Sequence, residues 1–131
     1  MIQTCVRPLA WGLFGIALAC GCQPAAPQVA RATVELQIEP DPPRVGDAAV
    51  ALLLTDPAGQ PLEGGTLKVE GNMNHAGMKP VFADLTETEP GRYEGTLDLT
   101  MAGDWFLLVT GKLSDGRQVN EKVDLPGVER P

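Results

Sequence analysis

Residues 93–125, YEGTLDLTMAGDWFLLVTGKLSDGRQVNEKVDL, decide the fold. Within residues 93–99 apolar or small residues alternate with polar ones, which is typical of a strand with one buried face. Residues 104–111 form a short, largely apolar run, which predicts a strand buried on both faces. The Ser-Asp-Gly sequence at 114–116 predicts a tight hairpin turn before a last strand. This stretch alone therefore predicts three successive strands.

The same two signals, period-two alternation and turn residues, recur through the preceding sequence. Proline, glycine and aspartate punctuate it about every 8–12 residues, and no long window outside residues 1–22 has a helical period. The expected strands are residues 34–39, 48–55, 67–70, 79–86, 93–99, 104–111 and 119–125. This pattern predicts an all-β, immunoglobulin-like, seven-stranded antiparallel β-sandwich, with Tyr93 and Trp105 as its largest core side chains.

The N-terminal residues 1–22 have the features of a lipoprotein signal peptide. Arg7 supplies a positive charge, and Leu9–Ala19 is apolar but shorter than the roughly 20 residues that span a bilayer. Small residues precede Cys20 as in a lipobox, so Cys20 is the expected acylated residue and Cys22 the alternative. An ordinary secretory signal with incidental cysteines is the competing interpretation.

The rest of the chain divides into a tether and a domain. Residues 23–31 are rich in proline and alanine and predict a flexible, extended tether, whereas residues 32–126 form the domain. The protein is therefore expected to be exported and anchored in the membrane through its lipid. Its domain would lie in the periplasm or on the outer face of the cytoplasmic membrane, where thiols are oxidised.

Composition excludes several kinds of function. Seventeen acidic against ten basic residues give a net charge of −7, which argues against a nucleic-acid partner. All three cysteines lie within the first 22 residues, so no disulfide framework is expected in the domain. A Ser-His-Asp triad would need His75 and Ser114, the only histidine and the only serine, which the expected topology places at opposite ends. We therefore expect that the protein is not an enzyme.

Residues 71–79, GNMNHAGMK, differ from an ordinary polar loop. Met73 and His75 are two apart and would project to one side of an extended segment, while Gly77 permits a reversal that returns Met78. Thioether and imidazole donors are neutral and soft or borderline, which suits Cu(I). Metal binding requires neutral imidazole, so affinity is expected to fall below about pH 6.5.

Topology adds Met101 as a fourth donor. Loops of such a sandwich alternate between its two ends, so the loop at residues 100–103 should lie at the same end as Met73 and Met78. Other interpretations stay open. Met73 and Met78 could fill gaps in the mouth of the sandwich, His75 could bond the loop backbone, and Met101 could cap the corner of its loop against Trp105. The acidic residues Asp41 and Asp47 are expected at this end as solvated surface, without the pattern of a calcium-binding loop.

Three motifs carry a resemblance to a known family. They are Met73-x-His75-x-Gly77-Met78, Pro90-Gly91-x-Tyr93-x-Gly95 and Met101-Ala102-Gly103-x-Trp105. Over about residues 33–124 the chain resembles the YtkA-like/FixH-like family of small exported domains. The resemblance implies an immunoglobulin-like sandwich linked to copper handling or cytochrome oxidase assembly. It also implies a copper donor or acceptor protein as partner, such as an oxidase subunit. The membrane-spanning anchor of FixH proteins is absent, and a lipobox replaces it.

Two functions remain in competition. The first is a lipid-anchored, extracytoplasmic protein that binds Cu(I) for delivery or homeostasis. The ligands would be Met73, His75, Met78 and Met101. The second is a metal-free, immunoglobulin-like interaction module at the cell envelope.

Overall fold

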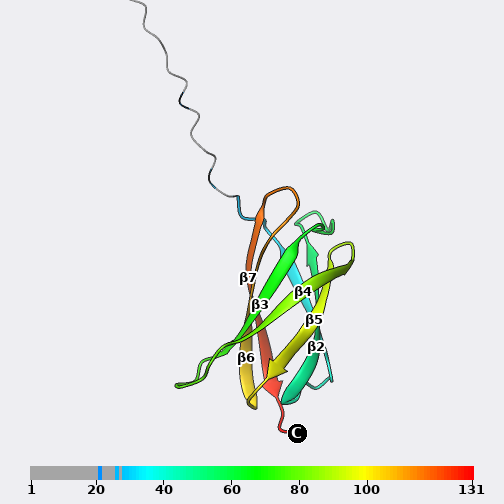
Figure 1. Ribbon diagram of the computed structural model, residues 1–131. Helices are drawn as coiled ribbons and strands as arrows, with labels where there is room; N and C mark the ends of the chain where they lie inside the picture. Colours follow the sequence, from blue (N-terminus) through cyan, green and yellow to red (C-terminus); the bar gives the residue numbers. More distant parts are fainter. Residues whose placement is uncertain (1–20, 22–25, 27) are drawn as a thin grey trace, which may run out of the picture.

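The computed structural model describes residues 21, 26 and 28–131, and it contains seven β-strands (Figure 1). The strands are β1 (Thr33–Glu39), β2 (Gly46–Thr55), β3 (Thr66–Met73), β4 (Val81–Glu89), β5 (Arg92–Leu99), β6 (Gly103–Lys112) and β7 (Gln118–Val128). The expected signal sequence apart from Gly21, both candidate lipidation sites (Cys20 and Cys22) and residues 23–25 and 27 of the tether fall outside the described residues. No helix in the described part of the chain is both long and apolar enough to cross a membrane.

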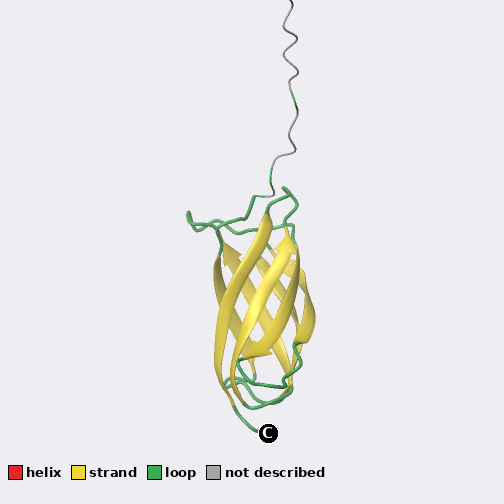
Figure 2. Ribbon diagram, turned by 90° about the vertical axis from the view of Figure 1, so that its left-hand side faces the viewer, coloured by secondary structure: helices red, strands yellow, loops and turns green. Residues whose placement is uncertain are grey.

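The strands pair antiparallel in the order β1-β2-β5-β4-β3-β6-β7. β4 belongs to both layers, because residues 81–85 pair with β3 whereas residues 86–89 pair with β5. One layer therefore consists of β1, β2 and β5, and the other of β3, β6 and β7, wrapped around one core (Figure 2). This architecture confirms the prediction of an all-β, immunoglobulin-like fold.

The core is built from the inward-facing residues of every strand. Tyr93 is fully buried and Trp105 is 2% exposed, which confirms them as the largest core side chains. Leu52, Leu54, Leu67, Leu97, Leu99, Leu107 and Val109 are fully buried around them.

Two expectations about the strands were wrong in detail. β6 is not buried on both faces, because Phe106 and Leu108 point to an outer face that no other layer covers and are only half-buried. The third strand does not end at Gly71 but continues to Met73, because β6 pairs with it along its whole length. A side chain at Gly71 would lie 2.8 Å from Val81, so glycine is needed inside this strand by close packing.

The loops gather at the two ends of the sandwich. Loops 40–45, 74–80 and 100–102 lie at the lower end of Figure 1, which we call the methionine end. Loops 56–65, 90–91 and 113–117 lie at the opposite end, which we call the tyrosine end.

Candidate functional site

Met73 is the last residue of β3, rather than a loop residue as expected. It lies opposite Trp105 in the register of β3 and β6, and its side chain packs half-buried against the core. Its backbone N–H donates a hydrogen bond of 3.0 Å to the Sδ atom of Met78. The sulfur of Met78 therefore returns across the loop to the end of β3.

The reversal that brings Met78 back is a tight turn over residues 75–78. The N–H of Met78 donates to the carbonyl oxygen of His75 at 3.4 Å, and Gly77 has a φ of +81°. A side chain at Gly77 would meet nothing within 4 Å, so the loop projects into open space. This is the reversal that Gly77 predicts from the sequence. His75 is exposed on this projecting loop.

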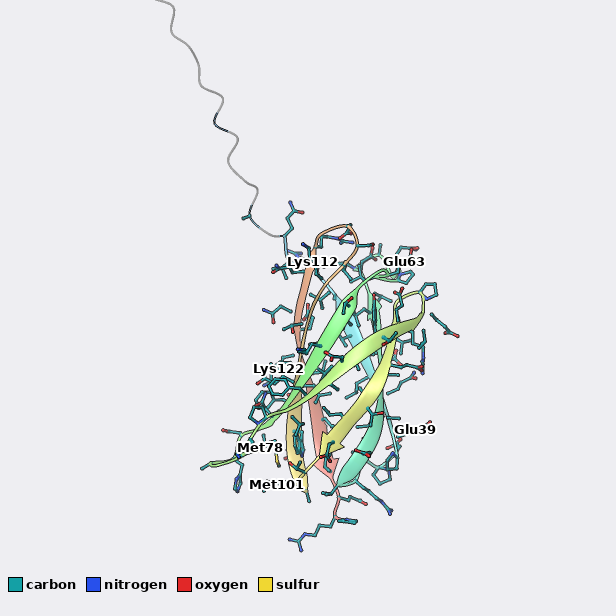
Figure 3. All side chains as sticks on the ribbon, in the orientation of Figure 1. Glu39, Glu63, Met78, Met101, Lys112 and Lys122 are labelled. Carbon is teal, nitrogen blue, oxygen red and sulfur yellow. The ribbon has the colours of Figure 1, made fainter. Side chains whose placement is uncertain are left out.

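Met101 lies on the neighbouring loop, between β5 and β6. Its side chain is 37% exposed, and its carbonyl oxygen accepts a hydrogen bond of 2.9 Å from the indole Nε1 of Trp105. The Met73 methyl group lies against the same turn, because a Cβ added at Gly103 would be 2.8 Å from Met73 Cε. Figure 3 shows Met78 and Met101 at the same end of the molecule. The three methionines therefore occupy one end, as loop alternation predicts.

The four candidate donors differ in their surroundings. Met73 and Met78 are half-buried and pack against the core, as gap-filling methionines also do. His75 and Met101 are exposed to solvent. The four residues thus lie at one end, with Met73 and Met78 against the core and His75 and Met101 toward solvent. The role of these residues as metal ligands stays a prediction.

Clusters of carboxylate, imidazole and thiol groups are a second kind of metal site to consider. Among the residues that the structure describes, no group of three or more histidine, cysteine, aspartate or glutamate side chains could hold a metal ion. Asp41 and Asp47 are exposed at the methionine end, as expected for solvated surface.

The tyrosine end contains a polar network that the sequence did not indicate. The hydroxyl of Tyr93 donates to the carbonyl oxygen of Leu62 at 2.8 Å and accepts from the N–H of Gly65 at 3.1 Å. Burial raises the pKa of Tyr93 to about 12. Ser114 lies in loop 113–117 at this end, whereas His75 lies at the other.

The sequence left open that Met101 caps the corner of the sandwich against Trp105, but it did not indicate the hydrogen bond that joins them. The two residues are four apart, and their contact runs through the carbonyl of Met101 rather than its side chain. The Met-x-Gly-x-Trp spacing is the signal that could have found it, because Gly103 turns the chain with a φ of +131° directly between them.

Comparison with known proteins adds a family. The model of the family described as YtkA-like matches residues 27–110, so the chain belongs to that family. The match includes Met73, His75, Met78 and Met101 and extends from the segment before β1 into β6. It confirms the YtkA-like part of the resemblance, and the FixH-like part stays a prediction. No curated protein and no solved structure was found to match the chain.

Proposed function

From the premise of a YtkA-like domain with a methionine-lined end, we propose a lipid-anchored, extracytoplasmic protein that binds Cu(I) as cargo. It would hold the ion for delivery to a copper acceptor, such as an oxidase subunit, or for copper homeostasis. The observation that carries the proposal is the gathering of three methionines and the only histidine at one end, from the last residue of β3 and two separate loops.

The chemistry of these donors favours a monovalent soft cation. Thioethers and imidazole are neutral, so they leave the charge of the ion uncompensated, which costs less for Cu(I) than for a divalent ion. The exposed His75 and Met101 are accessible to the ligands of a partner. A partner could therefore replace them one at a time, which suits transfer rather than permanent storage.

The place where the chain enters the domain supports a particular orientation of the domain relative to the membrane. The N–H of Gln118 donates to the carbonyl oxygen of Gln28, and Val29 forms a bridge with Gln118. Gln118 begins β7 at the tyrosine end, so the chain enters the domain there (Figure 1). A lipid on Cys20 would therefore attach to the far end of the domain, and the methionine end would face away from the membrane.

The test is an anaerobic Cu(I) titration of the mature domain against a competing chelator. We expect one equivalent of Cu(I), and a loss of affinity of about 100-fold or more when Met73, His75 and Met78 are all replaced by alanine. Trp105 is the only tryptophan after Cys20, so its fluorescence reports binding beside Met73.

The matched control places three alanines in the exposed loop of the tyrosine end, at Ser114, Asp115 and Arg117. This variant should bind Cu(I) like the parent, and circular dichroism should show that both variants are folded. Unchanged affinity in the methionine-end variant would refute the proposal.

A metal-free interaction module is the second candidate. It is favoured by Phe82, which is 59% exposed on the outer face of β4, and by the half-buried Phe106 and Leu108 of β6. Copper content after purification under reducing conditions separates the two functions, because only the first predicts stoichiometric copper.

A further inference from the structure

The two outermost strands of the sheet, β1 and β7, leave a slot between them. They stand at opposite ends of the strand order and are not hydrogen-bonded neighbours. Only isolated parallel bridges flank β1, where Val29 meets Gln118 and Arg44 meets Glu129 among the described residues. The chain is thus joined to β7 before and after β1, but the length of β1 itself is not paired with β7.

The slot has an apolar floor and an acidic rim. Its volume is about 450 Å³, which is within the usual range of ligand sites. Leu36 and Ile38 of β1 and the buried Leu125 of β7 line it. Asp41 and Asp124 line its edge, and no lysine or arginine is among the residues that line it. We call this feature the β1–β7 slot.

The backbone of β1 offers hydrogen bonds to the slot. In an antiparallel pair, alternate residues direct their N–H and C=O groups away from the partner strand. β1 is paired with β2 along one edge, and residues 33–39 contain no proline, so its other edge keeps its donors. The side of β7 is less suited to pairing, because Pro126 has no N–H and the N–H of Gly127 donates to Asp104.

Charge favours a basic occupant. Asp41 and Asp124 are the charged residues that line the slot. The Nζ of Lys122 is 3.7 Å from Asp124, but both side chains are well exposed, so this pair is weak. Arg44 is engaged with Glu129 beside the slot. A net acidic rim attracts cations and repels acidic segments.

We propose that the β1–β7 slot binds an extended segment of a partner protein in which apolar residues alternate with lysine or arginine. The segment would add a strand to β1, place its apolar side chains against Leu36, Ile38 and Leu125, and direct its cations to Asp41 and Asp124. The slot opens beside loop 40–45 at the methionine end, so the partner would lie next to the methionine loops. The proposal does not depend on copper.

The test uses a short synthetic peptide of alternating lysine and valine, titrated into the isotope-labelled domain and followed by NMR. We expect shifts confined to β1, loop 40–45 and the end of β7. Replacing both Asp41 and Asp124 by lysine should weaken binding by about 10-fold or more, since it reverses the charge of the rim. The matched control replaces Asp47 and Asp98, an exposed register pair on β2 and β5, by lysine and should leave the affinity within about threefold.

Two altered peptides distinguish strand addition from simple charge attraction. A peptide with glutamate in place of lysine should not bind. A lysine peptide that is N-methylated at every second residue keeps its charge but loses its edge hydrogen bonds, and should bind at least about 10-fold more weakly. Equal weakening by both pairs of aspartate substitutions, or shifts centred on Phe82 and Phe106, would overturn the proposal. A doubled mass in light scattering of the free protein would also overturn it, because a second copy would then occupy the slot.

Discussion

Among the described residues, the hydrogen bonds of the tyrosine end all end on oxygen, whereas at the methionine end one of them ends on sulfur. At the tyrosine end Tyr93 bonds two loop positions through its hydroxyl. The Glu87 carboxylate accepts hydrogen bonds from the N–H groups of Gly64 and Gly91. At the methionine end the corresponding contacts are the N–H of Met73 to the sulfur of Met78, and Trp105 to the carbonyl of Met101.

This difference concerns how easily each end can exchange its contacts. Hydrogen bonds to oxygen are strong and directional, and burying them fixes the loops. Thioether sulfur is a weak acceptor, so the bond between Met73 and Met78 costs little to replace. We infer that the methionine end can change its contacts on binding a cation, while the tyrosine end stays rigid.

The largest expected loss of stability is for Gly91→Ala at the tyrosine end, and it is compared with Gly77→Ala at the methionine end. Gly91 has a φ of +77°, and an added Cβ would lie 2.7 Å from Pro61 Cβ and 2.9 Å from the carbonyl oxygen of Leu54. Gly91→Ala should therefore lose about 3 kcal/mol of unfolding free energy, from strain and overpacking together. Gly77→Ala meets open space and should lose only about 1 kcal/mol, from φ alone. Urea unfolding measures both, and equal losses would contradict a packed tyrosine end.

The second-largest expected loss of stability comes from removing the hydroxyl group of Tyr93. Tyr93→Phe keeps the ring but leaves the carbonyl of the buried Leu62 and the N–H of Gly65 without this partner. We expect a loss of about 1–2 kcal/mol in urea unfolding. The control Phe82→Leu changes an exposed aromatic side chain and should stay within about 0.5 kcal/mol of the parent. An unchanged unfolding free energy in Tyr93→Phe would show that water replaces the hydrogen bonds of Tyr93 at no cost.

Local patterns predicted the strands well, because alternation and turn residues act within a few positions. The placement of Met73, Met78 and Met101 at one end was also predictable, since loop alternation in an antiparallel fold needs only the strand count. What local patterns did not predict was the inclusion of Met73 in β3. That depends on pairing with Trp105, which is distant in the sequence.

Other features depend on what covers a surface. The apolar run of β6 predicts burial on both faces, but Phe106 and Leu108 have no layer above them and are only half-buried. β4 changes partner between residues 85 and 86, which requires the curvature of the whole sheet. The β1–β7 slot likewise arises from the separation of two strands far apart in the chain, so no local motif marks it.

The pKa of Tyr93 gives a third test of the tyrosine end. Burial raises it from 10.0 to about 12, so folding favours the neutral phenol. This contribution to stability is complete below pH 10 and is lost as the pH rises to 12. Tyr93 is the only tyrosine, so an absorbance titration reports it alone, with a midpoint near 12 in the folded protein and near 10 in urea. Between pH 10 and 12 the Tyr93→Phe variant should lose less unfolding free energy than the parent. A titration midpoint near 10 in the folded protein would contradict a buried hydrogen-bonded hydroxyl.

The smallest effect on stability is expected at the methionine end, where it separates packing from binding. Met78→Leu keeps an apolar side chain of similar size but removes the sulfur that accepts from Met73, and should cost about 0.5 kcal/mol. Met101→Leu alters an exposed side chain and should cost less. Both should nevertheless weaken Cu(I) binding about 10-fold or more, because leucine has no donor atom. If Met78→Leu destabilises the fold as much as Gly91→Ala while Cu(I) affinity is retained, the sulfur serves packing alone and the two ends do not differ in function.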